Sequence, residues 1–371
     1  SSIMPTFSRL FSEINIDSLV IKNRLVVAPM TRVSASPEGV PTDIMEQHYQ
    51  DYSEGGWGLV ITEGTYIDEQ FSQGYRNQPG IANKQHIQSW RKIVDAVHKT
   101  NTPIFLQLIH AGGLIQENRY ESRAIAPSET ELLGKMLPHY YGQGKFPVPK
   151  KISTQQIKET VANFGLAAKN AMEAGFDGIE IHGANGYLLD QFLTVFSNQR
   201  DDEYGGNIDN RIRFHCEVLQ SVLDVANGKI PVGMRISQTK VNNFEYEWPG
   251  GEEDASFIFK KMKSVGPSYI HISTHKGLEP VWQTEHNLAY YAKKHFEGLV
   301  IACGGLHNPE KAENILRNNE ADIVAVGKGA IANPNLPKDI RSNKELLGFV
   351  PEMIRPLATI ENTLNWRKNN I

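Results

Sequence analysis

The sequence predicts a closed (β/α)8 barrel, also called a TIM barrel, and three observations lead to it. Eight short runs rich in Val, Ile and Leu recur along the chain, and helical patterns lie between them. The interiors of these runs are almost continuously apolar, which is typical of parallel strands buried on both faces. The length of 371 residues holds such a barrel, about 250 residues, together with additions. The predicted strands are Arg24–Pro29, Gly58–Glu63, Pro103–Leu108, Asp177–His182, Pro231–Ile236, Tyr269–Ser273, Leu299–Cys303 and Asp322–Val326.

Helix start signals lie between these runs. Asn83 is a cap candidate before an apolar face that contains Trp90, Ile93, Val94 and Val97. Ser153 and Gln156 have the spacing of a capping box. Asn308 is followed by Pro309, a favoured first helical residue. An open, doubly wound sheet is the alternative to a barrel, and the lack of a GxGxxG motif after the first strand disfavours it.

Two stretches exceed what a plain barrel needs. Residues 1–22 contain a hairpin signal around Asp17 and Ser18. Residues 111–152, after the third strand, are rich in Gly, Pro and Tyr and predict a long capping segment over the barrel mouth. We therefore expect residues 1–371 to form a single domain that includes this cap.

Composition excludes several classes of protein. Hydrophobic residues make up 40% and charged residues 22%, as in ordinary globular proteins, and the formal net charge of −4 disfavours a nucleic-acid binder. No apolar run approaches the ~18 residues of a membrane span, and Ser1 to Phe11 does not resemble a secretory signal. Two cysteines, Cys216 and Cys303, are too few for a disulfide framework or a zinc ribbon. We therefore expect a cytoplasmic protein without a metal site.

Catalytic groups of such barrels come from the carboxyl ends of the strands. The exits of strands seven and eight carry Gly304 and Gly305, and Gly327, Lys328 and Gly329. Glycines allow backbone N–H groups to approach an anion, and Lys328 adds a positive charge, so a phosphate site is one interpretation. The other interpretation is that the glycines only end the strands tightly.

The exit of the fourth strand carries His182, Asn185 and Tyr187 within the stretch HGANGY. His182 and Asn185 can donate hydrogen bonds to one ligand oxygen, and Tyr187 can supply a proton. A purely structural role for His182 is the alternative. Zinc is disfavoured because no second His or Cys lies nearby at ligand spacing.

Two further polar residues end apolar strands. Arg235 needs a partner for its charge, either an anionic ligand or a salt bridge to Glu63 or Glu180. The amide of Gln107 can contact the edge of a heterocycle or hydrogen-bond to a neighbouring strand.

Together these segments resemble the Old Yellow Enzyme family of flavin-dependent ene-reductases, in its Thr-containing branch, over roughly residues 5 to 360. The resemblance rests on five ordered blocks, of which HGANGYLLDQFL is the most specific. The blocks are Asn23–Arg32 (NRLVVAPMTR), Gln107–Gly113 (QLIHAGG), His182–Leu193 (HGANGYLLDQFL), Asn198–Phe214 (NQRDDEYGGNIDNRIRF) and Gly327–Pro337 (GKGAIANPNLP).

The resemblance implies a bound FMN and a nicotinamide reductant, NADPH or NADH. It places one group of residues along the flavin ring: Pro29, Met30, Thr31, Gly64 and Gln107. It places Arg235 at the N1/O2 edge, where a cation stabilises reduced flavin. The phosphate would be held by Gly304, Gly305, Gly327 and Lys328.

Two positions distinguish this chain from other members of the family. Many members have Arg where this chain has Lys328, and Lys does not provide a bidentate fork. One bacterial branch has Cys where this chain has Thr31. A third branch carries an iron–sulfur cluster and a further dinucleotide domain, which two cysteines and 371 residues exclude.

The resemblance implies reduction of the activated C=C bond of α,β-unsaturated carbonyl compounds and related electrophilic alkenes. In this interpretation FMN N5 delivers hydride, His182 and Asn185 bind the carbonyl oxygen, and Tyr187 protonates the product. One alternative is another FMN barrel reaction, such as oxidation of a 2-hydroxy acid, which needs a base where HGANGY offers donors. The others are a Schiff-base aldolase that uses Lys276 and a flavin-binding protein without turnover. The physiological substrate, the choice between NADH and NADPH, the oligomeric state and the conformation of the cap are not determined by the sequence.

Overall fold

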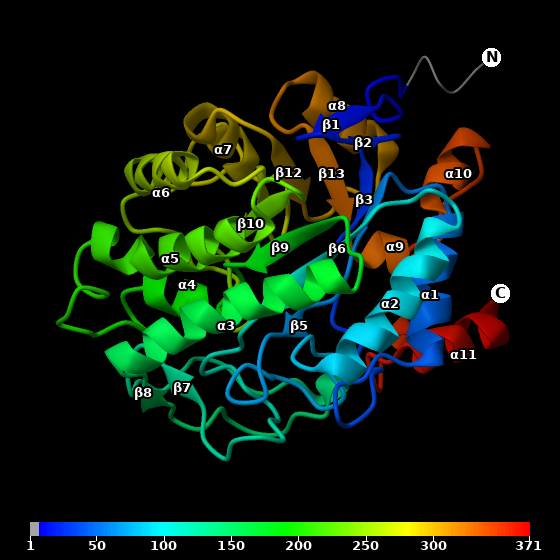
Figure 1. Cartoon of the computed structure of the whole chain (residues 1–371). Helices are drawn as coiled ribbons and strands as arrows, with labels where there is room; N and C mark the ends of the chain where they lie inside the picture. Colours follow the sequence, from blue (N-terminus) through cyan, green and yellow to red (C-terminus); the bar gives the residue numbers. More distant parts are fainter. Residues whose placement is uncertain (1–6) are drawn as a thin grey trace.

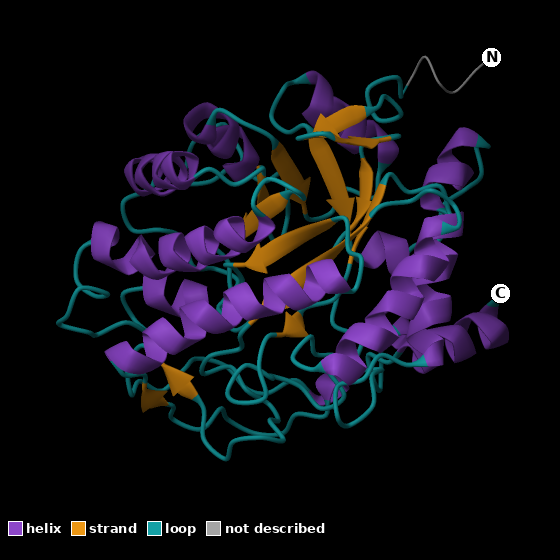
Figure 2. Cartoon of the chain, viewed as in Figure 1, coloured by secondary structure: helices purple, strands orange, loops and turns teal. Residues whose placement is uncertain are grey.

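The computed structural model describes residues 7–371 and contains a closed, parallel eight-stranded barrel (Figures 1 and 2). The barrel closes because β4 pairs with β3 on one side and with β6 on the other. The barrel prediction is confirmed, and the open-sheet alternative is wrong. Its strands are β3 (Leu25–Val27), β4 (Leu59–Ile61), β6 (Ile104–Ile109), β9 (Gly178–His182), β10 (Val232–Ile236), β11 (Tyr269–Ser273), β12 (Val300–Cys303) and β13 (Ile323–Val326).

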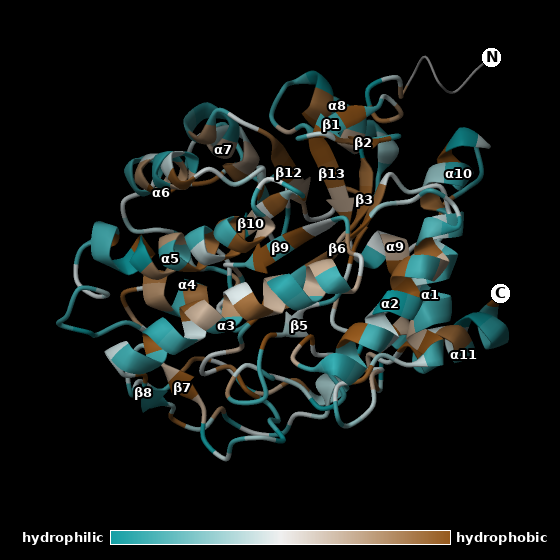
Figure 3. Cartoon of the chain, in the orientation of Figure 1, coloured by the Kyte–Doolittle hydropathy of each residue, from teal (hydrophilic) through white to brown (hydrophobic). Residues whose placement is uncertain are grey.

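Helices cover the outside of the barrel, with apolar faces toward the strands and polar faces outward (Figure 3). The predicted caps are present: Asn83 Oδ1 accepts from His86 N at 2.9 Å, and Ser153 and Gln156 form the reciprocal capping box. Asn308 likewise caps the helix that begins at Pro309. The helices are α1 (Asp43–Glu54), α2 (Lys84–His98), α3 (Thr154–Glu173), α4 (Leu188–Leu193), α5 (Ile208–Ala226), α6 (Glu252–Val265), α7 (Leu288–Phe296), α8 (Pro309–Arg317), α9 (Lys328–Ala332), α10 (Leu336–Arg341) and α11 (Ile360–Asn370), with 3-10 turns at Pro138–Tyr140 and Pro351–Met353.

The predicted N-terminal hairpin closes one end of the barrel. Its strands β1 (Ile14–Ile16) and β2 (Leu19–Ile21) pair antiparallel across Asp17 and Ser18. Ile16 and Ile21 join the apolar cluster inside the barrel, which also contains Phe105 and Tyr269. The Tyr269 ring fits only because its neighbour is Gly233, where a Cβ atom would lie 2.0 Å from the ring. Since this end of the barrel is packed with side chains, the functional site belongs at the other end.

The cap, residues 111–152, lies at the end opposite the hairpin (Figure 1), where the strands exit. It is mostly irregular (Figure 2), with one parallel pair, β7 (Ile125–Ala126) and β8 (Lys150–Lys151). A short strand β5 (Thr65–Tyr66) extends the sheet beside β6. Gly113 N donates to Gln191 Oε1 at 3.0 Å, which ties the cap to α4. Pattern alone could not give this path, because the segment is held by such individual hydrogen bonds.

The C-terminal helix α11 packs beside α1 (Figure 1). The buried guanidinium of Arg32, just after β3, donates to the carbonyl oxygens of Ala358 and Thr359 and to the hydroxyl of Thr363. These bonds attach the last segment of the chain to the exit of the first barrel strand.

Within residues 7–371, no helix is long and apolar enough to cross a membrane. Both cysteines are free: Cys216 lies on α5 and Cys303 at the end of β12. The expectation about a secretory signal at Ser1 to Phe11 falls mostly outside the described residues.

Candidate functional site

Parallel pairing brings three basic side chains to the same level inside the barrel mouth. Arg235 on β10 is in register with His182 on β9 and with His271 on β11. All three side chains are buried. A barrel interior that is apolar near the hairpin therefore becomes polar where the strands end, with Arg235 between two histidines.

The HGANGY loop after β9 is held in place by hydrogen bonds that its backbone N–H groups donate. Gly183 N donates to Arg235 O at 2.9 Å, and Asn185 N donates to Ser237 Oγ at 2.8 Å. Asn185 has a φ of +61°, a left-handed conformation that Asn tolerates better than most residues. Gly186 N donates at 2.8 Å to Asp190, whose carboxylate is paired with Lys240 at 2.9 Å. The loop therefore presents its side chains in one fixed arrangement.

His182 is a neutral hydrogen-bond donor in this site. Burial, and then the charges of Arg235 and His271, hold the pKa of His182 well below its ordinary value. Its Nδ1 atom accepts from Ala184 N at 3.3 Å. The proton of the neutral ring is therefore on Nε2, which is free to donate to a ligand.

The phenol of Tyr187 lies next to His182 and stays protonated. The two rings are 5.0 Å apart, edge to face. Burial raises the pKa of Tyr187, so its hydroxyl is protonated at neutral pH. Its oxygen lies 2.5 Å from that of Tyr75, which in turn packs against the ring of Tyr140.

Arg235 has no acidic partner. Among residues 7–371 no carboxylate lies within ion-pair distance of its guanidinium, and its buried Nε has no hydrogen-bond partner. The alternative of a salt bridge to Glu63 or Glu180 is therefore absent, and the interpretation of an anionic ligand remains. Its Nη2 contacts Cys303 Sγ at 3.6 Å.

The side-chain amide of Gln107 forms a hydrogen bond with a neighbouring strand, which is one of the two roles expected for it. Its Nε2 donates to Glu180 Oε2 on β9 at 2.8 Å. Its Oε1 faces Gly64, where an added Cβ atom would lie 3.3 Å from that oxygen. The carbonyl end of the amide is therefore the part that a ligand can contact.

The exit of β3 provides the other predicted ring contacts. Pro29, Met30 and Thr31 are half-buried, and within the described residues the Thr31 hydroxyl makes no hydrogen bond. Met30 reaches toward the last strand, because a Cβ atom at Gly327 would lie 3.7 Å from its sulfur.

The two glycine clusters lie side by side because β12 and β13 are neighbouring strands. Gly304 and Gly305 have φ values of +120° and +66°, which favour glycine, and a Cβ atom at Gly305 would meet open space. Lys328, the residue after Gly327, has its ammonium 5.4 Å from the centre of the Phe349 ring. Exposed backbone and a nearby cation are what an anionic group requires.

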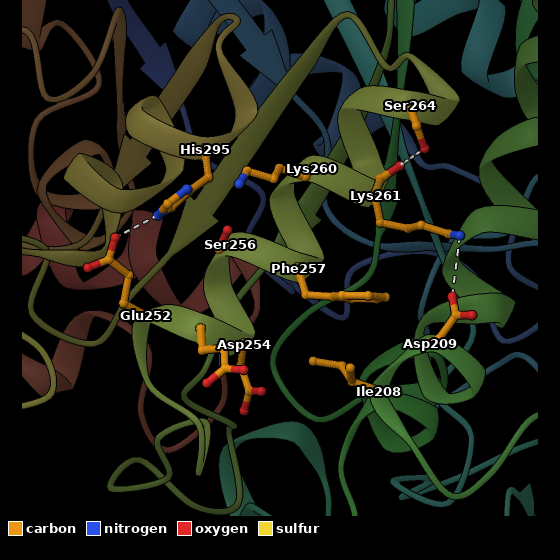
Figure 4. A pocket seen from close by; sticks show the side chains of 11 residues that line it. Ile208, Asp209, Glu252, Asp254, Ser256, Phe257, Lys260, Lys261, Ser264 and His295 are labelled. Atoms are coloured by element: carbon orange, nitrogen blue, oxygen red, sulfur yellow. Dashed lines mark hydrogen bonds and ion pairs between the residues drawn. The ribbon is translucent and has the colours of Figure 1, made fainter.

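Other sites have less support. Lys276, the aldolase candidate, is exposed and paired with Glu279 at 3.4 Å, whereas a Schiff-base lysine requires a desolvated amine. The groove in Figure 4 is lined by residues on or beside the outer helices α5, α6 and α7, and none comes from a strand end. Two of its lining pairs are in contact, Lys261 with Asp209 at 3.3 Å and His295 with Glu252 at 2.8 Å. Residues 7–371 contain no cluster of His, Cys, Asp and Glu that could hold a metal.

Sequence reasoning did not identify several residues of this site. Tyr75 and Tyr140 belong to irregular loops, where no periodic pattern indicates position. His271 and Cys303 lie in predicted strands, and their inward orientation could have been inferred from the alternation of β11 and β12.

Three comparisons identify known proteins to which this chain is similar. The model of the NADH:flavin oxidoreductase / NADH oxidase family matches residues 9–346. A "probable flavin mononucleotide-dependent alkene reductase" of Leishmania infantum is 38% identical, over 85% of this chain and 86% of that protein. The solved structure of the old yellow enzyme from Trypanosoma cruzi is 29% identical, with a TM-score of 0.86, and covers 97% of this chain and 99% of that one. Morphinone reductase in complex with tetrahydroNAD is 30% identical, with a TM-score of 0.81, over 95% and 96% of the two chains.

Proposed function

This chain belongs to the NADH:flavin oxidoreductase / NADH oxidase family, and we propose that it is an FMN-dependent ene-reductase. Its substrates are α,β-unsaturated carbonyl compounds and related electrophilic alkenes, and its reductant is a nicotinamide nucleotide. Family membership confirms the resemblance identified in the sequence. The reaction is supported by the relative from Leishmania infantum, whose name is that of an alkene reductase.

One observation carries the proposal: a single rigid loop presents a neutral imidazole donor and a protonated phenol next to each other. The rings of His182 and Tyr187 are 5.0 Å apart, and both side chains are buried at the strand exits. An oxidase of 2-hydroxy acids would need a base there to remove a proton. Donors instead suit a reaction in which negative charge develops on a carbonyl oxygen and a carbon is then protonated.

The residues at the strand exits fit FMN. In the described part of the chain the buried Nε of Arg235 lacks a partner, and the N1/O2 edge of the flavin would provide one. The half-buried Thr31 and the carbonyl end of Gln107 would contact the ring, together with Pro29, Met30 and Gly64. Gly304, Gly305, Gly327 and Lys328 would hold the phosphate. When bound, FMN supplies hydride to the β-carbon of the alkene.

The residues of the chain would do the rest. His182 Nε2 and the Asn185 amide donate to the substrate carbonyl oxygen and stabilise the charge that develops on it. Tyr187 then transfers its phenolic proton to the α-carbon. Tyr75 keeps the Tyr187 oxygen in place through their hydrogen bond of 2.5 Å.

Several finer features belong to the proposal. The proposed reductant is NADPH or NADH. The proposed function is compatible with a monomer and with a homo-oligomer. We place the protein in the cytoplasm on the support of its two free cysteines. No nucleic-acid or membrane partner is proposed, given the formal net charge of −4.

Anaerobic stopped-flow spectroscopy tests the function. NADPH or NADH should bleach the flavin, and a panel of enones, nitroalkenes and quinones should restore its colour. Bleaching by a 2-hydroxy acid, or recolouring by oxygen alone, would contradict the proposal. A flavin that no nicotinamide reduces would indicate a binding protein without turnover.

A further inference from the structure

A chain of buried polar groups crosses the barrel beneath the proposed flavin site. At its centre the Glu180 carboxylate, fully buried, accepts three hydrogen bonds. They come from Gln107 Nε2 at 2.8 Å, His271 Nδ1 at 2.8 Å and Tyr269 OH at 3.0 Å. A carboxylate with this many donors is held in one position.

His271 links this carboxylate to the far side of the site. Its ring is fully buried, on the strand next to Arg235 and in register with it. Within residues 7–371 its Nε2 has no hydrogen-bond partner, and the thiol of Cys303 lies beside the ring. The same thiol receives the contact from Arg235 Nη2 at 3.6 Å. Contacts therefore lead from Gln107 through Glu180, His271 and Cys303 to Arg235, whose strand β10 lies between those of Glu180 and His271.

The charges of this chain are unequal. Burial disfavours a charge on His271, but Glu180 outweighs it, so the pKa of His271 is raised. Burial also disfavours the charge on Glu180, yet His271 and then Arg235 bring its pKa below the ordinary value. One carboxylate therefore has two basic neighbours. The nearer one, His271, forms the hydrogen bond with Glu180, and Arg235 makes no ion pair with it among residues 7–371.

We propose that His271 is a positioning residue that neutralises Glu180 and thereby keeps the positive charge of Arg235 available to the N1/O2 edge of the flavin. This inference rests on the proposed function, because it takes FMN as the ligand of Arg235. Without His271, the carboxylate would attract Arg235 instead and reduce the positive potential at the cofactor. Reduced flavin, anionic at N1/O2, would then be less stable relative to oxidised flavin.

The midpoint potential of the bound flavin tests this, measured by equilibration with a reference dye. In His271→Gln the ratio of reduced to oxidised flavin at a fixed potential should fall at least tenfold, about 30 mV for a two-electron couple. In Glu180→Gln it should not fall, because no carboxylate remains to oppose Arg235. The double variant Glu180→Gln/His271→Gln should return to within about threefold of the parent. Tyr269→Phe is the matched control, since it removes one hydrogen bond to Glu180 without changing a charge, and it should leave the ratio within threefold.

The double variant separates electrostatics from packing. If His271 only fills space, the effects of the two substitutions on the ratio of reduced to oxidised flavin should add. A double variant whose ratio is as low as that of His271→Gln, or lower, overturns the inference. An unchanged potential in His271→Gln with flavin bound also overturns it. Should His271→Gln fail to fold, 15N NMR of the parent tests the proposal instead. The imidazole signal of His271 is the one that is missing from the spectrum of the double variant. The proposal requires a doubly protonated ring at pH 7, and a neutral ring overturns it. Failure of the proposed function is distinguishable, because the parent would then hold no FMN or would not be reduced by a nicotinamide.

Discussion

The phenol oxygens of Tyr187 and Tyr75 lie 2.5 Å apart. Burial raises the pKa of both phenols, so both are protonated at neutral pH and either hydroxyl can donate in their hydrogen bond. When Tyr75 donates, the hydroxyl proton of Tyr187 is free to point at a substrate.

Replacing Tyr187 by Phe should separate the two half-reactions. Flavin reduction by NADPH or NADH needs no proton from the phenol and should continue near the parent rate. Oxidation by cyclohexenone should slow by ~10²–10⁴, the usual contribution of a positioned general acid. A nitroalkene should suffer less, because its nitronate is stable enough to be protonated in solution. Equal losses in both half-reactions, measured by stopped-flow, would reject the proton-donor role.

Replacing Tyr75 by Phe removes the bond to Tyr187 but keeps the ring. We expect a smaller effect on cyclohexenone reduction, roughly tenfold, because Tyr187 retains its proton and loses only its orientation. Flavin reduction should again be unchanged. A loss as large as that of Tyr187→Phe would assign the proton itself to Tyr75.

The purified protein should be yellow and should contain one FMN per chain. The reason is the unpaired Arg235 together with the open backbone at Gly305. Release by denaturation, followed by chromatography, identifies the flavin. Recovery of FAD, or of no flavin from a well-folded preparation, would contradict the cofactor assignment.

His182→Ala should bind flavin but lose affinity for phenols, because a phenol oxygen would accept from His182 as the substrate oxygen is proposed to do. One donor to a developing oxyanion contributes ~3 kcal/mol, so enone reduction should slow about 100-fold. Spectral titration with a phenol measures the first effect and stopped-flow the second. Unchanged phenol affinity would show that His182 is structural.

The sequence was sufficient for the barrel, and the reason is physical. Its strands are apolar on both faces and its helices carry local cap signals, so both are encoded within a few residues. The site residues after β9 followed from the position of strand ends.

What could not be predicted depends on contacts between distant segments. The bond of Tyr75 to Tyr187 spans 112 residues, and the partner of Gln107 proved to be Glu180. The cap lacks periodicity altogether, so pattern could only give its extent.

Acid should destabilise the fold through its buried neutral histidines. Burial lowers the pKa of His110 and of His215 to about 4. Below about pH 6.5 the unfolded chain binds protons that the folded chain refuses, so the free energy of unfolding falls as pH drops toward 4. Each such histidine contributes about 1.4 kcal/mol per pH unit in this window. The raised pKa of His271 has the opposite effect on the pH dependence of stability. The contribution of one buried histidine is therefore measured by comparing the parent with a variant that lacks it.

His215 allows that comparison, because it contacts Gly183 O at 3.0 Å and has no place in the proposed chemistry. Urea unfolding at pH 7.5 and pH 5.5 should show a smaller loss of stability for His215→Asn than for the parent, by about 1.4 kcal/mol. The variant should be less stable at both pH values, since it loses packing. Equal losses in the two proteins would refute a neutral His215.

Arg235 and Lys328 should affect opposite ends of FMN. Arg235→Ala removes the only cation proposed at N1/O2, so it should abolish flavin binding or lower the midpoint potential. Lys328→Ala removes a charge at the phosphate, so FMN retention should weaken by roughly 10- to 100-fold, with little change in potential.

Arg235→Lys and Lys328→Arg sharpen the comparison. Lys keeps the charge of Arg235 but not its fork, so it should restore part of the potential, while Arg at 328 can grip the phosphate with two bonds and should tighten retention. Equilibrium dialysis of FMN and dye-coupled potentials measure the two effects. If Lys328→Ala shifts the potential and Arg235→Ala only loosens FMN, then the ring and the phosphate have been placed the wrong way round.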